Sequence, residues 1–325
     1  MSEHPRDRFD LIPDASAEAS FLDALAKGRL HHAWLLCGVE GSGKSTFAYR
    51  AARRLLGAAP DPSRGLLGTD PNDHVARMIA AQSHPDLLVL ERLVEGGKTR
   101  KSISVDQARD LPEFFSKSPS QAEYRVAIID AADDLNLNAA NALLKVLEEP
   151  PERGVLFLVT HAPGRLLATI RSRCRRLAFP VWPQHALEEL VRNKTGVPTS
   201  EAVRIAGMAG GSPGQALALA SGATLEADQM AQDWVAAAQV DRAEAMAIAD
   251  KFRGAEGQER FETLMERLIA AVKVRALQEG ASGARWAELW SRLSELPERA
   301  AAINLDRADV LAGALADLQR TKAAS

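Results

Sequence analysis

The sequence has little cysteine, little net charge and no long apolar run. Its 325 residues include two cysteines, Cys37 and Cys174, which lie in separate patterned segments. Two isolated cysteines argue against a disulfide framework or a thiolate metal site, so reduced and buried thiols are expected. A formal charge of −3 provides no global basic field that would bring the chain onto DNA unaided. Any contact with nucleic acid would have to be local or shared with partners.

The sequence also lacks a stretch that would enter a membrane. Charged residues occupy the N-terminal positions where a signal peptide would need an apolar core, and no later run approaches the length of a bilayer-spanning helix. We therefore expect a cytoplasmic protein without membrane contact. A chain of 325 residues is longer than one hydrophobic core usually supports, so two or three domains are expected.

The first 178 residues alternate short apolar runs with helical patterns, which is typical of a parallel sheet with helices on both faces. The compact apolar runs predict strands at Ala33–Cys37, Leu87–Leu90, Arg125–Ile129, Val155–Val159 and Arg175–Phe179. A helix is predicted at Asn138–Glu149, because Leu143, Val146 and Leu147 share one helical face and Pro150 cannot continue it. The sequence therefore predicts an α/β domain.

The composition changes from Pro180 onward, where prolines and a glycine pair separate short helical pieces without a strand signal. Further on, apolar residues at helical spacing in 261–272 and 286–293, Trp290 included, predict faces buried in a bundle. The segment 98–101 is expected to be a solvated loop tip. The predicted domains are the α/β domain at 1–178, a small helical lid at 179–220 and a C-terminal all-α bundle at 221–325.

A phosphate-binding loop is predicted directly after the first strand. Residues 38–46 read GVEGSGKST, which fits G-x-x-x-x-G-K-[ST], and an apparent helix follows through Leu56. The glycines let successive N–H groups converge on phosphate oxygens, and the helix presents its positive end to the same anion. Lys44 would add charge at the β and γ phosphates, and Ser45 would offer a hydroxyl to Mg²⁺. The predicted ATP-binding residues of this loop are Gly38, Gly41, Gly43, Lys44, Ser45 and Thr46.

Asp130 ends the third strand, where a carboxylate can hold the magnesium ion together with Ser45. Hydrolysis also requires a group that orients the attacking water, and the next residue, Ala131, has none. Asp133 or Asp134 could substitute, but acidic residues at a helix start are ordinary capping groups.

Three segments together resemble the clamp-loader branch of the AAA+ ATPases, and the resemblance covers the first 220 residues. They are Leu30–Leu36, Asn138–Pro151 and Ile170–Cys174. In that branch the hydrolysing tau/gamma subunits carry a glutamate directly after the strand-end aspartate, whereas delta prime subunits do not. Ala131 therefore makes this chain similar to the delta prime class. Gly214 agrees, because the hydrolysing subunits place a nucleotide-contacting arginine there. Resemblance to the AAA+ ATPases also implies that Thr160 or His161, after the fourth strand, occupies the place of the polar residue that senses the γ-phosphate.

The resemblance implies a trans-acting role for Arg173 in the motif Ser172-Arg173-Cys174. This arginine would project into the ATP site of a neighbouring subunit and neutralise charge on its γ-phosphate. The alternative interpretation is a surface arginine in a salt bridge. The resemblance further implies a stator in the bacterial DNA polymerase III clamp loader, with a helical collar at its C-terminus, no polymerase site and no ATP hydrolysis of its own. The implied partners are the tau/gamma and delta subunits, the sliding clamp, and primed DNA within the complex.

The sequence departs from the family pattern in two respects. Many relatives carry a four-cysteine zinc module, but Arg53–Pro85 contains no cysteine and only two histidines, so no zinc site is predicted. The phosphate loop is intact, whereas some delta prime subunits have degraded theirs, which favours binding of ATP with magnesium. Two other functions stay open: a self-sufficient AAA+ ATPase that uses Asp133, and a P-loop small-molecule kinase. A kinase would have no use for Ser172-Arg173-Cys174 and would need a catalytic base that the sequence does not reveal.

Overall fold

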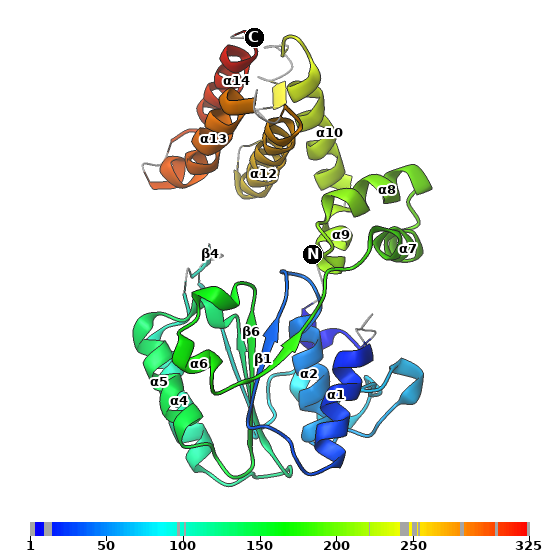
Figure 1. Ribbon diagram of the computed structural model, residues 1–325, viewed down its shortest axis with the longest axis vertical. Coiled ribbons are helices and arrows are strands. Elements are labelled where there is room, and N and C mark those ends of the chain that lie inside the picture. Colours follow the sequence, from blue (N-terminus) through cyan, green and yellow to red (C-terminus); the bar gives the residue numbers. More distant parts are fainter. Residues whose placement is uncertain are drawn as a thin grey trace. The chain divides into compact units, whose positions relative to one another are not determined.

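The computed structural model describes residues 4–9, 15–95, 98–100, 102–220, 222–240, 247–248, 252, 254–279, 283–302 and 305–323 (Figure 1). The chain forms two compact units, Met1–Leu217 and Ala218–Ser325. The first unit contains the strands and most of the predicted lid, and the second contains the C-terminal helices. The three-domain division, with boundaries after residues 178 and 220, stays a prediction.

A parallel sheet of five strands forms the centre of the first unit in the described part of the chain. Its order is β2-β5-β6-β1-β7, and every neighbouring pair is parallel. Each strand ends within one residue of its predicted bounds. The strands are β1 (Ala33–Cys37), β2 (Leu87–Glu91), β5 (Arg125–Asp130), β6 (Gly154–Thr160) and β7 (Arg175–Ala178).

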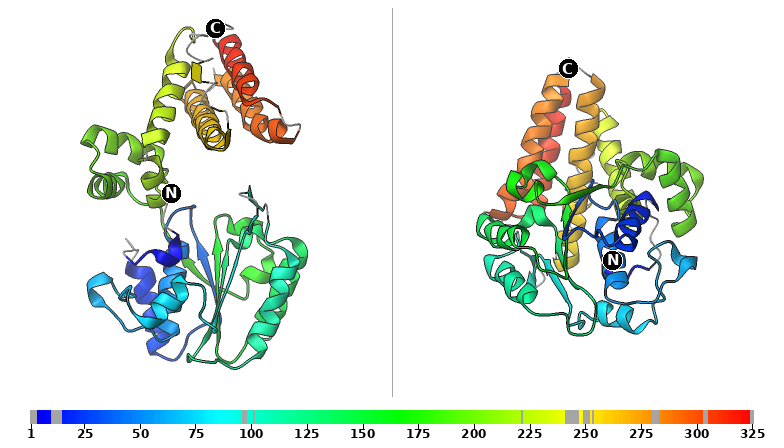
Figure 2. Two further views of the ribbon diagram at one scale, coloured as in Figure 1. Left: turned by 180° about the vertical axis from the view of Figure 1, so that it is seen from behind. Right: turned by 60° about the horizontal axis from the view of Figure 1, so that its bottom comes forward.

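Helices cover both faces of this sheet, which explains why its central strands are apolar without alternation. In Figure 1, α1 (Ala15–Ala26) and α2 (Lys44–Leu55) lie on one face, and α4 (Val105–Ser116) and α5 (Leu137–Glu148) lie on the other. The view from behind shows the same layers (Figure 2, left). Alternate β1 residues enter opposite cores: Trp34 and Leu36 pack on the α2 side, whereas Leu35 and Cys37 pack on the α5 side. The predicted α/β fold is therefore confirmed.

Shorter elements connect these layers. The first unit also contains α3 (His74–Ala80) and α6 (Ala168–Arg171). After β2 along the chain, β3 (Val94–Glu95) pairs with β4 (Lys98–Thr99) as an antiparallel hairpin. Lys98 and Thr99 therefore belong to a hairpin strand, whereas the sequence predicted only a loop. Gly96, Gly97 and Lys101 lie outside the described residues.

The elements after β7 in the described part of the chain are helices. The segment predicted as a lid contains α7 (Gln184–Thr195), α8 (Thr199–Met208) and α9 (Pro213–Leu219). The second unit contains α10 (Gly222–Ala236), α12 (Gly254–Glu279), α13 (Ala284–Ala302) and α14 (Arg307–Ala323). Phe261 and Leu268 of α12 pack with Trp286 and Leu289 of α13 in the core of the second unit. The prediction that Trp290 is buried was wrong: its side chain is exposed, and the Lys273 ammonium lies 5.5 Å from its ring centroid. None of the described helices is both long and apolar enough to cross a membrane.

Candidate functional site

The predicted phosphate loop connects the carboxyl end of β1 to the first turn of α2. Gly41 and Gly43 have φ angles of 73° and 91°, in the left-handed region that glycine enters without steric cost. Helix α2 begins at Lys44, so its positive N-terminal end faces the loop. The loop therefore has the strand, turn and helix context in which backbone N–H groups bind phosphate.

The Lys44 side chain lies inside this loop and is 2% exposed. Its Nζ donates hydrogen bonds to the carbonyl oxygens of Gly38 and Val39, at 2.8 and 2.6 Å. Burial lowers the pKa of Lys44 to about 8, and the negative charges of Asp130 and Asp133 oppose that shift. Two neutral carbonyls are weaker partners for an ammonium than a phosphate would be. The lysine is therefore placed to exchange a carbonyl for an anion.

Ser45 and Asp130, the two predicted magnesium ligands, are brought together. Burial raises the pKa of Asp130, and a hydrogen bond from Ser45 and the charge of Lys44 act in the opposite direction. A hydroxyl and a carboxylate are oxygen ligands of the kind that Mg²⁺ accepts beside phosphates and water. Within the described ranges, no three side chains of His, Cys, Asp or Glu gather as a metal site. A magnesium ion here would thus need phosphate and water oxygens to complete its shell.

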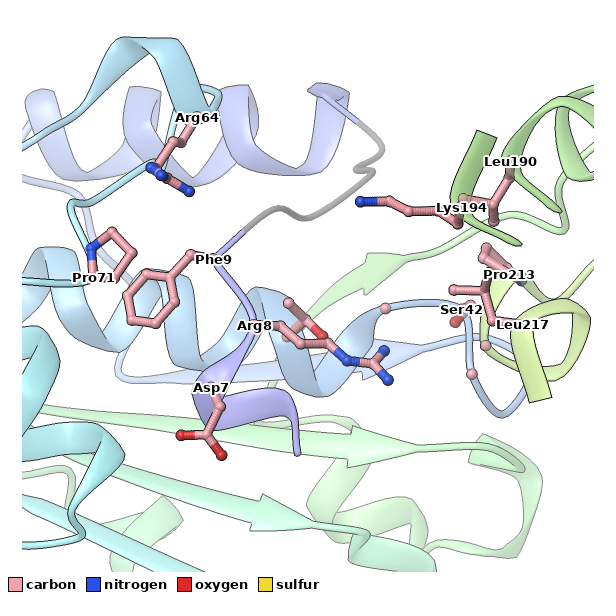
Figure 3. Close-up of a pocket in the computed structure, with 14 residues that line it drawn as sticks. Asp7, Arg8, Phe9, Ser42, Arg64, Pro71, Leu190, Lys194, Pro213 and Leu217 are labelled. Atoms are coloured by element: carbon pink, nitrogen blue, oxygen red, sulfur yellow. The ribbon is translucent and has the colours of Figure 1, made fainter. Parts of the chain in front are cut away.

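A cavity of about 590 Å³ adjoins the phosphate loop (Figure 3), within the usual range for small-molecule sites. Figure 3 shows Leu190 and Lys194 of the lid facing Phe9 and Arg64 across it. The lining residues are Asp7, Arg8, Phe9, Gly41, Ser42, Gly43, Thr46, Arg64, Pro71, Leu190, Lys194, Pro213, Gly214 and Leu217. The lining combines apolar side chains and backbone of the phosphate loop with four charged residues, Asp7, Arg8, Arg64 and Lys194, a mixture that suits a nucleotide.

Two buried arginines of α2 hold one wall of this cavity, and sequence analysis missed both. Arg50 pairs with the buried Glu18 carboxylate at 2.7 Å and donates to the Phe9 carbonyl oxygen at 2.7 Å. Arg53 donates to the Arg8 carbonyl oxygen at 3.2 Å, and its guanidinium lies 4.0 Å from the centroid of the Phe9 ring. The helix that follows the phosphate loop therefore also fixes the N-terminal segment. An arginine in a helix is ordinarily a surface residue, so the sequence offered no signal for this role.

The lid touches the phosphate loop through its backbone. The Ser212 hydroxyl donates to the Glu40 carbonyl oxygen at 2.7 Å, and the Gly214 N–H donates to the Gly41 carbonyl oxygen at 2.9 Å. A Cβ added to Gly214 would lie 2.8 Å from Gly41 Cα, which is closer than real contacts allow. Gly214, the position expected to lack an arginine, therefore has no room for any side chain unless the neighbouring backbone shifts.

The Asp133 carboxylate accepts hydrogen bonds from the loop that follows β6. The buried Thr160 hydroxyl donates to its Oδ1 at 2.7 Å, and the His161 N–H donates to its Oδ2 at 2.6 Å. Both carboxylate oxygens therefore accept hydrogen bonds from the predicted sensor segment. Ala131, directly after Asp130, is buried.

Arg173 lies between α6 and β7, and β7 is an edge strand of the sheet. Its Nη2 is 3.1 Å from Glu148 Oε1, and its Nη1 donates to the Thr169 carbonyl oxygen at 3.1 Å. Arg173 makes a surface ion pair, as the alternative interpretation of this residue predicts. Its side chain nevertheless keeps 37% of its surface exposed.

Neither cysteine has the environment of a reactive thiol. Burial raises the pKa of Cys37, and it raises the pKa of Cys174 to about 12. Both groups therefore stay protonated at neutral pH. The cysteine beside Arg173 packs against the core and has no part in the candidate chemistry.

The sheet order, the phosphate loop at the end of β1 and the helical lid define a P-loop domain of the AAA+ type. The family described as DNA polymerase III, delta subunit, matches residues 14–182. The chain belongs to this family.

Named relatives agree with the family match. The delta' subunit of DNA polymerase III from Pseudomonas aeruginosa is 39% identical over 56% of this chain and 53% of that protein, and the Escherichia coli delta' subunit is 36% identical over 60% and 56%. The predicted resemblance to delta prime subunits is confirmed. The chain spans about half the length of these curated relatives in the matched regions.

A solved structure agrees in fold. The gamma subunit-related DNA polymerase III protein of Thermotoga maritima superposes with a TM-score of 0.52 and covers 94% of this chain and 99% of its own, at 18% identity. At that identity the likeness concerns the fold alone.

Proposed function

We propose that this chain acts as the delta prime subunit of a DNA polymerase III clamp loader, where it is a stator that does not hydrolyse ATP. The observation that carries the proposal is an intact phosphate loop combined with Ala131 after Asp130. Such a site holds a nucleotide and lacks the carboxylate that orients water. The family match and the delta' names of the relatives support the same assignment.

The nucleotide site would take ATP with magnesium. Lys44 would release a loop carbonyl and bind the β and γ phosphates, while Ser45 and Asp130 would offer oxygens to the ion. The cavity between the Phe9 segment and the lid would take the base and the ribose. Thr160 would lie at the γ-phosphate end, with its hydroxyl already held by Asp133.

A self-sufficient ATPase is the second candidate, and the contacts of Asp133 speak against it. A surrogate base must turn toward the attacking water, whereas hydrogen bonds from the Thr160 hydroxyl and the His161 N–H hold the Asp133 carboxylate against the segment after β6. Turnover by the isolated chain that Asp133→Ala abolishes would favour this candidate. A small-molecule kinase is the weaker alternative, because it leaves Arg173 without a role.

The proposed partners follow from the stator role. Arg173 would act on ATP bound by a neighbouring tau/gamma subunit, and the C-terminal helices would join the collar that includes delta. The complex would open the sliding clamp and place it on primed DNA. Because the chain's net charge is −3, we expect the other subunits to supply most phosphate contacts.

The test is the ATPase rate of a reconstituted loader, stimulated by clamp and primed DNA, with wild-type chain or Arg173→Ala. We expect a loss of at least roughly ten-fold, because arginine fingers contribute about 10³ or more to turnover. Arg171→Ala, an exposed arginine two residues away, is the matched control and should retain the rate. Assembly is checked by size-exclusion chromatography. A fully assembled Arg173→Ala loader with normal turnover would refute the trans role.

A further inference from the structure

We propose that Glu148 is a positioning residue for Arg173: its carboxylate holds the guanidinium in the direction from which it reaches a neighbour's nucleotide. This inference rests on the proposed trans role of Arg173.

Two groups from different elements converge on the Arg173 guanidinium. The Glu148 carboxylate, at the end of α5, lies 3.1 Å from Nη2, and the Thr169 carbonyl oxygen, in α6, lies 3.1 Å from Nη1. These contacts use one donor on each terminal nitrogen of a planar fork that carries five N–H donors. These two contacts orient the guanidinium before any phosphate is present.

Both supports stand on well-packed backbone. Val146 and Leu147, just before Glu148, are buried in the core beside the sheet. The Arg173 N–H donates to the carbonyl oxygen of Ile170, which is 1% exposed. The C-terminal end of a helix also attracts a cation, which adds to the attraction of the carboxylate for Arg173. Both the backbone and the guanidinium of Arg173 are therefore held by groups that belong to the packed sheet domain.

The exposure of the pair separates a positioning role from a stabilising one. The side chains of Arg173 and Glu148 are 37% and 52% exposed. Ion pairs in such positions contribute little to folding stability. Pre-orientation, in contrast, lowers the ordering cost of the arginine when a phosphate arrives in an adjoining chain. Loss of Glu148 should therefore change turnover of the assembled loader and leave folding nearly unchanged.

Glu148 would act only through Arg173. A carboxylate brought against a triphosphate would repel it, so direct contact with the neighbour's nucleotide is unfavourable. The arginine instead bridges the two anions, with Glu148 on its own chain and phosphate on the other. Glu148 and Arg173 must consequently behave as one unit when both are replaced.

The experiment is a double-substitution cycle in the reconstituted loader, read as stimulated ATP turnover. Glu148→Ala should lower kcat by roughly three- to ten-fold, the coupling expected for neighbouring charged groups, with little change in KM for ATP. In an Arg173→Ala background, the Glu148 substitution should have no further effect. Glu149→Ala, the adjacent exposed glutamate, is the matched control and should match wild type. Glu148→Gln keeps an oxygen acceptor and should recover part of the lost rate.

The outcomes separate the two proposals. Normal turnover with Arg173→Ala defeats the trans role and this inference with it. If Arg173→Ala is slow but Glu148→Ala equals wild type, or if the two losses multiply, Glu148 does not position the arginine and the stator function stands. Melting temperatures of the isolated variants show whether folding contributes. If Glu148→Ala unfolds, Glu148→Gln decides. A folded Glu148→Gln variant with the wild-type rate, or one whose loss multiplies with that of Arg173→Ala, overturns the inference.

Discussion

Lys44 shows how a single buried charge prepares the site for an anion. Its ammonium is desolvated inside the loop, and its two nearest acceptors are neutral carbonyl oxygens. Burial lowers the pKa of Lys44 to about 8, so the free site begins to lose its positive charge in mildly alkaline solution. A bound phosphate would stabilise the charged form and raise that pKa again.

This linkage predicts a pH-dependent nucleotide affinity. Above pH 8 the bound form holds a proton that the free form has lost, so raising the pH from about 8 to 10 should weaken ATP binding and binding should take up a proton. Calorimetric titrations in buffers of different ionisation enthalpy measure both quantities. Lys44→Arg keeps its charge throughout this range and should bind with a pH-independent affinity. A flat profile for the wild-type chain would contradict the prediction.

A close approach between two backbone segments connects the lid to the phosphate loop. The N–H of Gly214 in α9 donates directly to the Gly41 carbonyl oxygen, and Ser212 adds a second hydrogen bond. The two glycines leave no room for a Cβ at either position. The lid is thus fastened to the loop by the chain's own contacts.

Gly214→Ala tests this fastening. The added methyl group would lie 2.8 Å from Gly41 Cα, so we expect a loss of about 1–3 kcal/mol in the free energy of unfolding. Faster hydrogen exchange of the amide at 214 and weaker nucleotide binding should accompany it. Gly207→Ala in α8 is the control, because nothing lies within 4 Å of its added Cβ. It should be neutral or stabilising by up to about 1 kcal/mol.

Strands were easier to predict from the sequence than contacts. Leu156, Phe157 and Leu158 sit in a strand buried on both faces, so the run is continuously apolar and its ends are sharp. Strands β3 and β4 have two residues each, too few for a periodic signal.

The candidate site was predictable where side-chain types carry the chemistry, and unpredictable elsewhere. Lys44, Ser45 and Asp130 were found by type and spacing. The hydrogen bonds of Arg50 and Arg53 to carbonyl oxygens were not, because every residue offers the same carbonyl. The ion pair of Arg173 with Glu148 depends on tertiary geometry that spacing along the chain does not encode.

At the scale of the whole molecule, the lining of the cavity ends at Leu217 and so comes entirely from the first unit. The helices of the second unit have a core of their own. We therefore expect nucleotide binding and subunit assembly to be separable properties.

A fragment that ends after α9, at residue 220, tests this separation. Because a domain with its own core can fold alone, it should bind ATP within about two-fold of the full chain. It should fail to join the reconstituted loader, as measured by co-elution with the other subunits. A folded fragment that cannot bind ATP, when the full chain does, would show that the second unit contributes to the site.

The contact between Gly41 and Gly214 limits how ATP hydrolysis could be introduced into this protein by substitution. Under the proposed non-hydrolysing function, Ala131→Glu and Gly214→Arg would supply the two groups that hydrolysing relatives are expected to carry. Any side chain at 214 would bring its Cβ to 2.8 Å from Gly41 Cα, so an arginine there requires the backbone contact with the phosphate loop to shift. The lid would have to move away from the phosphate loop, and the hydrogen bonds donated by Ser212 and Gly214 would need new acceptors. If the chain does not hydrolyse ATP, as proposed, the main-chain contact helps to preserve that state, because a side chain added at 214 would reduce stability before it could contribute to activity.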